Sequence, residues 1–187
     1  MYGIDILYTE HDHVVRFTNY LRKLCGEILM GEKPDKDTWL KCVDFIRVYA
    51  DDHHHGKEEE ILFTVMLEKL GSVAHKMINT GMLVEHNLAR YHTQSLEEAV
   101  NALSEEPTLE EKLNLITHAL SYVDLLQRHA HKENNVLFPF AARSLSPEDL
   151  EKVNEASKTF EEEGAKKGIG KYVDWLMEVY PDAVSEH

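Results

Sequence analysis

The chain has 187 residues, a length that suits one domain with a buried core of its own. Its formal net charge of −14 disfavours binding to nucleic acid or to anionic membranes, because such a surface repels phosphate groups. There is no apolar run of membrane-spanning length and no visible signal peptide, and two cysteines are too few for a disulfide scaffold, so we expect a cytoplasmic protein. Twelve histidines are the unusual feature, because histidine is the commonest metal ligand.

Apolar residues recur at spacings of three and four in four runs, which predicts four amphipathic helices. These runs cover residues 7–28, 43–65, 82–103 and 115–140. Glycine and proline fall between them, near 31–35, 71, 81 and 107. The stretch 71–80 is the least clear link. Because short links favour antiparallel neighbours, we expect an all-α, antiparallel up-down-up-down four-helix bundle over residues 1–143.

Further signals mark helix starts in the second half of the chain. Thr108 to Glu111 has the form of a capping box that opens the fourth helix. Another helix is predicted to begin at Ser146-Pro147 and to run to about Glu163, beyond which glycines interrupt it. A short helix from Tyr172 to Tyr180 follows. We expect residues 144–187 to form a C-terminal helical extension packed on the bundle.

The strongest signal is an internal repeat at a constant offset of 75 residues, the separation of His11 and His86. It relates three pairs of motifs: Glu10-His11 and Glu85-His86, His54-x-x-x-Glu58 and His129-x-x-x-Glu133, and Leu62-Phe63 and Leu137-Phe138. Two similar helical hairpins related by a pseudo-twofold axis should therefore make the bundle. Six repeated residues lie in apolar stripes, where polar groups are costly unless something compensates. They are His11, His54, Glu58, His86, His129 and Glu133.

Bound cations are the obvious compensation for four imidazoles and two carboxylates that converge on a bundle interior. His54 and Glu58 are one helical turn apart, so both project toward the same point, and His129 repeats this arrangement with Glu133. We expect each of two metals to take the two imidazoles of one hairpin, with Glu58 and Glu133 bridging the pair. Nitrogen and oxygen donors without thiolate suit iron or manganese better than structural zinc.

At these residues the sequence resembles the hemerythrin-like, or HHE cation-binding, family over roughly residues 4–143. The resemblance implies an oxo- or hydroxo-bridged centre of two iron ions in a four-helix bundle, with manganese or zinc as alternative metals. Oxygen carriers of that family place another histidine one turn after the ligand His86, where this chain has Arg90, and an aspartate where it has Glu133. The chain is therefore more similar to members with four histidines and two glutamates, which are linked to iron-centre repair and to nitric oxide or oxidative stress.

These features predict a non-haem di-iron protein that reacts with or senses small oxidants such as dioxygen, peroxide or nitric oxide. Oxidative or nitrosative stress and iron-centre repair are the expected settings. The alternative is a non-enzymatic oxygen or redox sensor, or an iron carrier, that acts through a partner protein. Whether the chain is an enzyme stays open. A ferritin-like oxidase is disfavoured, because Glu-x-x-His occurs at Glu10 to His13 without a repeat partner.

Four histidines beside the apolar stripes are expected to support the site or to face solvent: His13, His53, His55 and His131. His13 is the competitor to His11 as a ligand. The repeat disfavours it, because the residue at the matching position is Leu88.

Acids and thiols near the six residues leave other questions. Glu10 and Glu85 either orient imidazoles or lie on a solvated helix face. Glu59-Glu60 is expected to be solvated. Cys25 and Cys42 are at similar heights on neighbouring helices and could form a redox pair, but buried inert thiols are favoured.

Overall fold

The computed structural model describes residues 1–181, and all the regular secondary structure in that range is helical. Residues 2–144 form four long helices. The first is α1 (Tyr2–Leu29). The second runs through α2 (Lys36–Asp44), the π-helical segments Phe45–His55 and Glu58–Phe63, and α3 (Thr64–Lys69). The third comprises α4 (Gly71–Met77), the π-helical Ile78–Met82, and α5 (Leu83–Ala102). The fourth comprises α6 (Leu109–Lys132), the π-helical Glu133–Leu137, and α7 (Phe138–Ser144).

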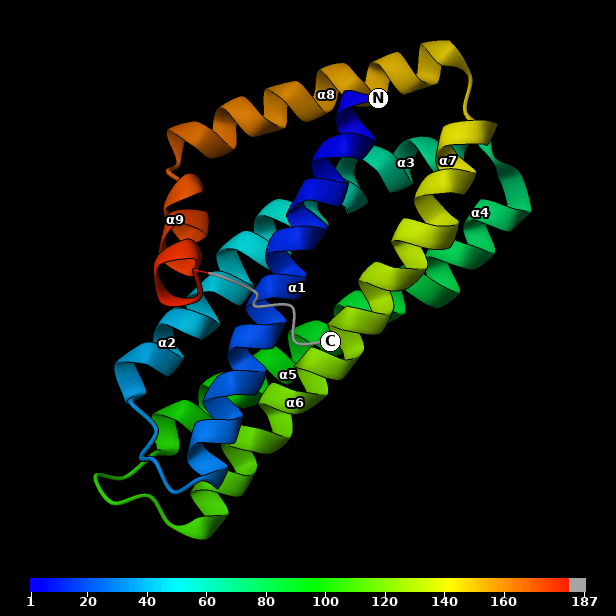
Figure 1. The fold of residues 1–187 in the computed structure, drawn as a ribbon. Coiled ribbons are helices and arrows are strands. Elements are labelled where there is room, and N and C mark those ends of the chain that lie inside the picture. Colours follow the sequence, from blue (N-terminus) through cyan, green and yellow to red (C-terminus); the bar gives the residue numbers. More distant parts are fainter. Residues whose placement is uncertain (182–187) are drawn as a thin grey trace.

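The four long helices run antiparallel in chain order (Figure 1). α6 packs against both α1 and α5, and α2 packs against α5. This arrangement confirms the all-α, up-down-up-down bundle predicted from the sequence. Among the described helices, none is both long and apolar enough to cross a membrane.

Local signals explain where the helices begin and turn. The Thr108 side chain accepts a hydrogen bond from the Glu111 backbone N–H, and the Glu111 carboxylate accepts one from the Thr108 N–H, which is the predicted capping box. Gly71 has a φ of +61°, a conformation that favours glycine and lets α3 turn directly into α4. The stretch 71–80, which the sequence left unclear, is helical.

Two further helices, α8 (Pro147–Lys166) and α9 (Gly170–Val179), pack on the bundle. α8 crosses from the end of α7 past the N-terminus (Figure 1). At Gly3, a Cβ atom would come within 2.8 Å of a Val153 methyl group, so glycine lets α1 and α8 approach closely. The helix predicted to run to about Glu163 continues through Gly164, which lies against the ring of His53, and ends at Lys166 just before Gly168, whose φ is +75°.

The division into a bundle of residues 1–143 and an extension of residues 144–187 stays a prediction. The start of α8 at Ser146-Pro147 agrees with the sequence, and the last helix begins at Gly170 rather than at Tyr172. Residues 182–187 lie outside the described range.

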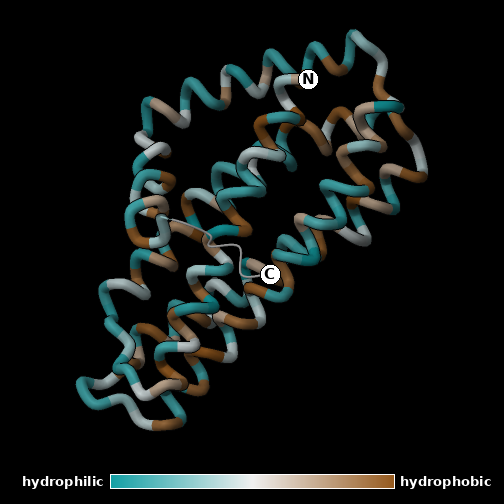
Figure 2. The backbone as a smooth tube through the Cα atoms, in the orientation of Figure 1, coloured by the Kyte–Doolittle hydropathy of each residue, from teal (hydrophilic) through white to brown (hydrophobic). Residues whose placement is uncertain are grey.

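The buried apolar side chains form two clusters, one on each side of a polar layer. One cluster includes Val14, Phe17, Phe45 and Tyr122. The other includes Leu7, Leu62, Phe63 and Phe138. His11 lies along α1 between Leu7 and Val14, and therefore between the clusters. Figure 2 shows hydrophobic and hydrophilic residues interleaved along the long helices, as expected when each helix buries one face.

Both thiols are free and buried in the first of these clusters. Burial raises the pKa of Cys25 to about 12 and moves that of Cys42 in the same direction. Thiols that stay protonated are poor nucleophiles and poor metal ligands, which agrees with the inert role favoured from the sequence.

Candidate metal centre

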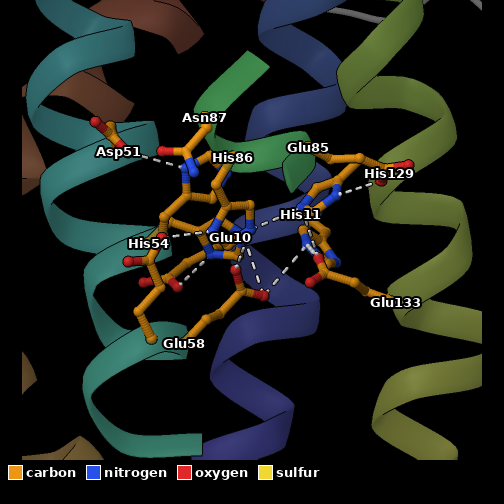
Figure 3. Close-up of polar contacts among 12 residues, drawn as sticks. Glu10, His11, Asp51, His54, Glu58, Glu85, His86, Asn87, His129 and Glu133 are labelled. Carbon is orange, nitrogen blue, oxygen red and sulfur yellow. Dashed lines mark hydrogen bonds and ion pairs between the residues drawn. The ribbon is translucent and has the colours of Figure 1, made fainter. Parts of the chain in front are cut away.

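The six residues selected by the repeat are all buried in the polar layer and point toward one another (Figure 3). Nε2 of His11 lies 3.1 Å from Oε2 of Glu133, and Nε2 of His129 lies 3.2 Å from the same oxygen. Nε2 of His54 lies 3.7 Å from Oε1 of Glu58, and Nε2 of His86 lies 3.5 Å from Oε2. Each carboxylate therefore lies between imidazoles of both hairpins, which is where a bridging group would have to lie.

Unusual helical geometry accompanies the two carboxylates. Glu58 and Glu133 each stand at the first position of a π-helical segment, at positions related by the repeat. π-helical turns form hydrogen bonds from residue i to i+5, are rare, and concentrate at functional sites. Their recurrence at matched positions indicates that the helices depart from α-geometry to aim these side chains inward.

Carboxylates outside the layer hold the imidazoles of His54 and His129. Oε2 of Glu10 lies 3.0 Å from Nδ1 of His54, and Oε2 of Glu85 lies 3.0 Å from Nδ1 of His129. The second oxygen of each carboxylate binds a lysine, Lys57 and Lys132 respectively. The bond to His129 lowers the pKa of Glu85 to about 2. Of the two alternatives left by the sequence, Glu10 and Glu85 therefore orient imidazoles, so that Nε2 faces the interior.

The other two imidazoles also have outer partners, from the opposite hairpin. Nδ1 of His11 lies 2.6 Å from Oδ1 of Asn134, and Nδ1 of His86 lies 2.6 Å from Oε1 of Glu59. The same offset of 75 residues relates Glu59 to Asn134. The expectation of solvated side chains holds for Glu60, which is exposed, but not for Glu59, which is only 28% exposed and also binds Arg90. Glu59 reaches His86 because the second and third helices cross at this height. The pattern of residues along one helix does not show where two helices cross.

The repeated Leu-Phe motifs line the same layer. Phe138 stacks on the ring of His11 with centroids 5.3 Å apart, and Phe63 stacks on the ring of His86 at 5.8 Å. Both aromatic rings belong to the second apolar cluster. In each hairpin, the phenylalanine of this motif therefore covers one side of the polar layer with an apolar ring.

The electrostatics of the layer are consistent with a bound cation. Among the described residues, no hydrogen bond satisfies the carboxylate oxygens of Glu58 and Glu133 or Nε2 of His11, despite the short distances. Burial and the neighbouring Glu133 raise the pKa of Glu58 well above its usual range. Burial opposes ionisation of Glu133 too, but His129 and His11 hold its pKa well below its usual range. Burial lowers the pKa of His54 to about 4, which favours the neutral imidazole that metals bind.

His55 is the member of the layer that the sequence did not reveal. It is 1% exposed, and its ring stacks on that of His86 with centroids 3.9 Å apart. Ligand atoms of four residues lie within 4.8 Å of one another: His55, Glu58, His86 and His129. A second such group contains His11, His54, Glu58 and Glu133. The π-helical segment Phe45–His55 brings the consecutive residues His54 and His55 into the polar layer, which α-helical spacing does not predict.

The remaining neighbouring histidines lie outside these two groups. Nδ1 of His13 is 2.6 Å from the Tyr49 hydroxyl, so this ring is directed away from the layer. Nε2 of His53 lies 3.1 Å from a Glu10 oxygen and 3.1 Å from a Glu161 oxygen. His131 is exposed. These positions match the supporting or exposed roles expected for them.

A cavity of about 40 Å³ adjoins the layer beside His55. Its lining includes Asp51, Arg90 and the fully buried Tyr122. Arg90 donates to Asp51 at 2.9 Å and to Glu59 at 2.8 Å, so its guanidinium is fixed at the wall. The chain therefore has a small chamber of mixed polar and apolar lining beside the layer.

A helical bundle with a buried layer of histidines and glutamates is a candidate metal-binding bundle. Residues 2–141 match the hemerythrin HHE cation binding domain family, and the chain belongs to that family. The resemblance found from the repeated motifs is thereby confirmed. Searches of curated proteins and of solved structures returned no match.

Proposed function

We propose that the chain holds two iron ions in the polar layer and reacts with or senses small oxidants such as dioxygen, peroxide or nitric oxide. A role in oxidative or nitrosative stress, or in repair of iron centres, would use this reactivity in the cytoplasm. One observation carries the proposal: two fully buried carboxylates without hydrogen-bond partners in the described chain face imidazole nitrogens from both hairpins. Divalent cations would satisfy all of these groups at once.

The donor set favours a redox-active metal. His11 and His54 would hold one ion, His86 and His129 the other, and the two buried carboxylates would be shared. Nitrogen and oxygen donors suit iron or manganese, whereas structural zinc sites commonly use thiolates, and both thiols of this chain lie in an apolar cluster. A bound ferrous pair supplies electrons to an oxidant, or a position at which the oxidant binds reversibly.

A cavity of about 40 Å³ adjoins the layer beside His55. A buried water requires about 10–15 Å³, so this space is compatible with a diatomic molecule or peroxide. Arg90 is held in the wall by Asp51 and Glu59, which limits how far the cavity can widen. The size of the chamber therefore supports a small oxidant as the ligand.

Metal analysis followed by rapid mixing tests the proposal. Protein purified without oxygen should contain two iron ions per chain, develop a visible oxo-bridge charge-transfer band in air, and change its spectrum in stopped-flow mixing with nitric oxide or peroxide. Glu58→Ala and Glu133→Ala should lose most of the metal, whereas His13→Ala should retain it. Wild-type protein that binds no iron, or ferrous protein unchanged by air, nitric oxide and peroxide, would contradict the proposal. Equal loss from all three variants would mean that His13, not His11, faces the metals.

A second candidate, a sensor or iron carrier that acts through a partner protein, is favoured by the contact between α8 and the site. Glu161 of α8 binds both Lys57 and His53. Both of these side chains also bind Glu10, which holds His54. A change at His54 could therefore reach α8 through a short series of direct contacts. Reversible oxygenation without turnover, together with partner binding that depends on the iron state, would support the sensor; sustained turnover of peroxide or nitric oxide would favour the reactive role.

A further inference from the structure

The helix α8 covers a groove on one hairpin of the bundle. It packs on α1 and on the π-helical Glu58–Phe63, which belong to the first and second long helices (Figure 1). The backbone N–H of Gly3 donates to Asn154 of α8 at 2.9 Å, and Glu161 of α8 binds Lys57. α8 therefore fills the outer groove between the first two long helices.

The repeat places a second groove of the same kind between the third and fourth long helices, and this groove is open. Ile61 is 9% exposed, whereas its repeat partner Val136 is 54% exposed. The side chain of Lys57 is 1% exposed, whereas that of Lys132 is 44% exposed. Because these residues match in type and in offset, the difference in exposure shows that the described chain leaves uncovered in one hairpin what α8 covers in the other.

The open groove has a volume of about 370 Å³ and a mostly apolar lining. Its large apolar side chains are Met77, Met82, Val136 and Leu137. Its charged side chains are Lys76, Glu85 and Lys132. An exposed apolar surface with charged residues around it is typical of a site that binds another protein.

The charges beside the open groove are complementary to a carboxylate. In the first hairpin, Glu161 of α8 is bound by Lys57 and His53. The repeat pairs these two residues with Lys132 and Arg128, which are both cationic. Lys57 binds two carboxylates, whereas Lys132 binds only one among the described residues. The open groove therefore has the cations that hold Glu161 in the first hairpin, without the carboxylate that α8 supplies there.

We propose that the open groove binds an amphipathic helix of a partner protein, which places a carboxylate beside Arg128 and Lys132. Such a helix would lay its apolar face into the groove, a recurring mode of recognition between proteins. Gly3, which lets α8 approach α1 closely, corresponds to Ile78, so the docked helix should lie farther from the third helix at that end. A second copy of this chain is disfavoured as the occupant, because each copy has a formal net charge of −14. This docking goes beyond the proposed function and does not require bound metal.

Fluorescence anisotropy with a labelled peptide of residues 147–166, the sequence of α8, tests the proposal on the full chain. The peptide should bind saturably, and to the open groove, because the tethered α8 already fills the first one at a high effective concentration. Val136→Glu should weaken binding by at least about tenfold, because docking would bury an unpaired charge against an apolar helix face. Lys132→Glu should also weaken it, and a peptide with Glu161→Lys should recover binding to that variant, because opposite charges then face each other again.

A matched control and a measurement of size keep the result interpretable. Leu113→Glu makes the same change as Val136→Glu at a similarly exposed residue of the same long helix outside the groove, and it should bind the peptide like the wild type. Absence of saturable binding to folded wild-type chain would overturn the proposal, as would binding that Val136→Glu and Lys132→Glu leave unchanged. Sedimentation velocity should find a monomer; a dimer that Val136→Glu abolishes would make a second copy the occupant and would also overturn the proposal.

Discussion

Replacement of Glu10 by glutamine should destabilise the metal-free protein far more than the same change at its repeat partner, Glu85. Both carboxylates hold an imidazole and a lysine. The side chain of Lys57, which binds Glu10, is 1% exposed, whereas that of Lys132, which binds Glu85, is 44% exposed. Replacement of the glutamate by glutamine therefore removes a charged partner from the buried Lys57 in one hairpin and from the half-exposed Lys132 in the other.

The exposures set the expected magnitudes. Loss of one partner of a buried ion pair costs about 3–5 kcal/mol, because the remaining charge stays buried without compensation. Glu161 remains beside Lys57, so we expect the lower end for Glu10→Gln, about 3 kcal/mol. The half-exposed pair of Glu85 and Lys132 contributes only about 0–1 kcal/mol, and the contact to an imidazole is lost in both variants, so the two lysines set the difference between them. For a chain of this length the difference corresponds to roughly 5–10 °C in Tm.

Urea unfolding of metal-stripped protein at neutral pH, followed by far-UV circular dichroism, measures both free energies. Glu85→Gln is the matched control, because it makes the same chemical change at the repeat-related position. Glu10→Gln combined with Lys57→Met should recover much of the stability lost by Glu10→Gln alone, since no unpaired ammonium group remains. Equal losses from the two single variants, or a loss below about 1 kcal/mol for Glu10→Gln, would refute the reasoning from burial.

Three other predictions concern packing, pH and the outer partners. Gly164→Ala should destabilise the protein by about 1–3 kcal/mol, because the added Cβ would lie 2.8 Å from Cε1 of His53. Gly26→Ala in α1 is the control: no atom crowds its added Cβ, so it should stabilise the protein by about 0.5–1 kcal/mol. Urea unfolding measures both changes. The free energy of unfolding of the metal-free protein should fall by up to about 3 kcal/mol between pH 6.5 and about 4. Burial lowers the pKa of His54, so the unfolded chain takes up a proton at a higher pH than the folded chain does. The stabilisation is complete above pH 6.5, and a His54→Asn variant should show a flatter dependence of stability on pH. Glu59→Gln should weaken metal binding by about 10–100-fold in chelator competition, and unchanged affinity would mean that this carboxylate does not orient its imidazole.

The bundle and the composition of its polar layer could be predicted from the sequence because both depend on spacing along single helices. Apolar positions at helical intervals place Leu7 and Val14 on one face, and His11 falls on that face between them. The offset of 75 residues then relates this helix to the third one, without any knowledge of how the helices cross. The structure brings together all six residues that these two signals select.

The supporting residues depend on features that spacing does not contain. His55 enters the layer because the second helix is π-helical there, and an α-helical projection places it beside the stripe. Glu59 reaches His86 because two helices cross at that height, which the sequence of one helix cannot show. Gly164 looks like a helix breaker by propensity, but close packing on His53 requires a residue without Cβ at that point of α8.

The polar layer that separates the two apolar clusters has a consequence for the stability of the protein. The clusters are packed within opposite ends of the bundle, and between them the helices meet through carboxylate oxygens that lack hydrogen-bond partners in the described chain. Cations bound there would contact helices of both hairpins in the folded chain alone. The free energy of unfolding should therefore rise with the concentration of a cation that the layer binds.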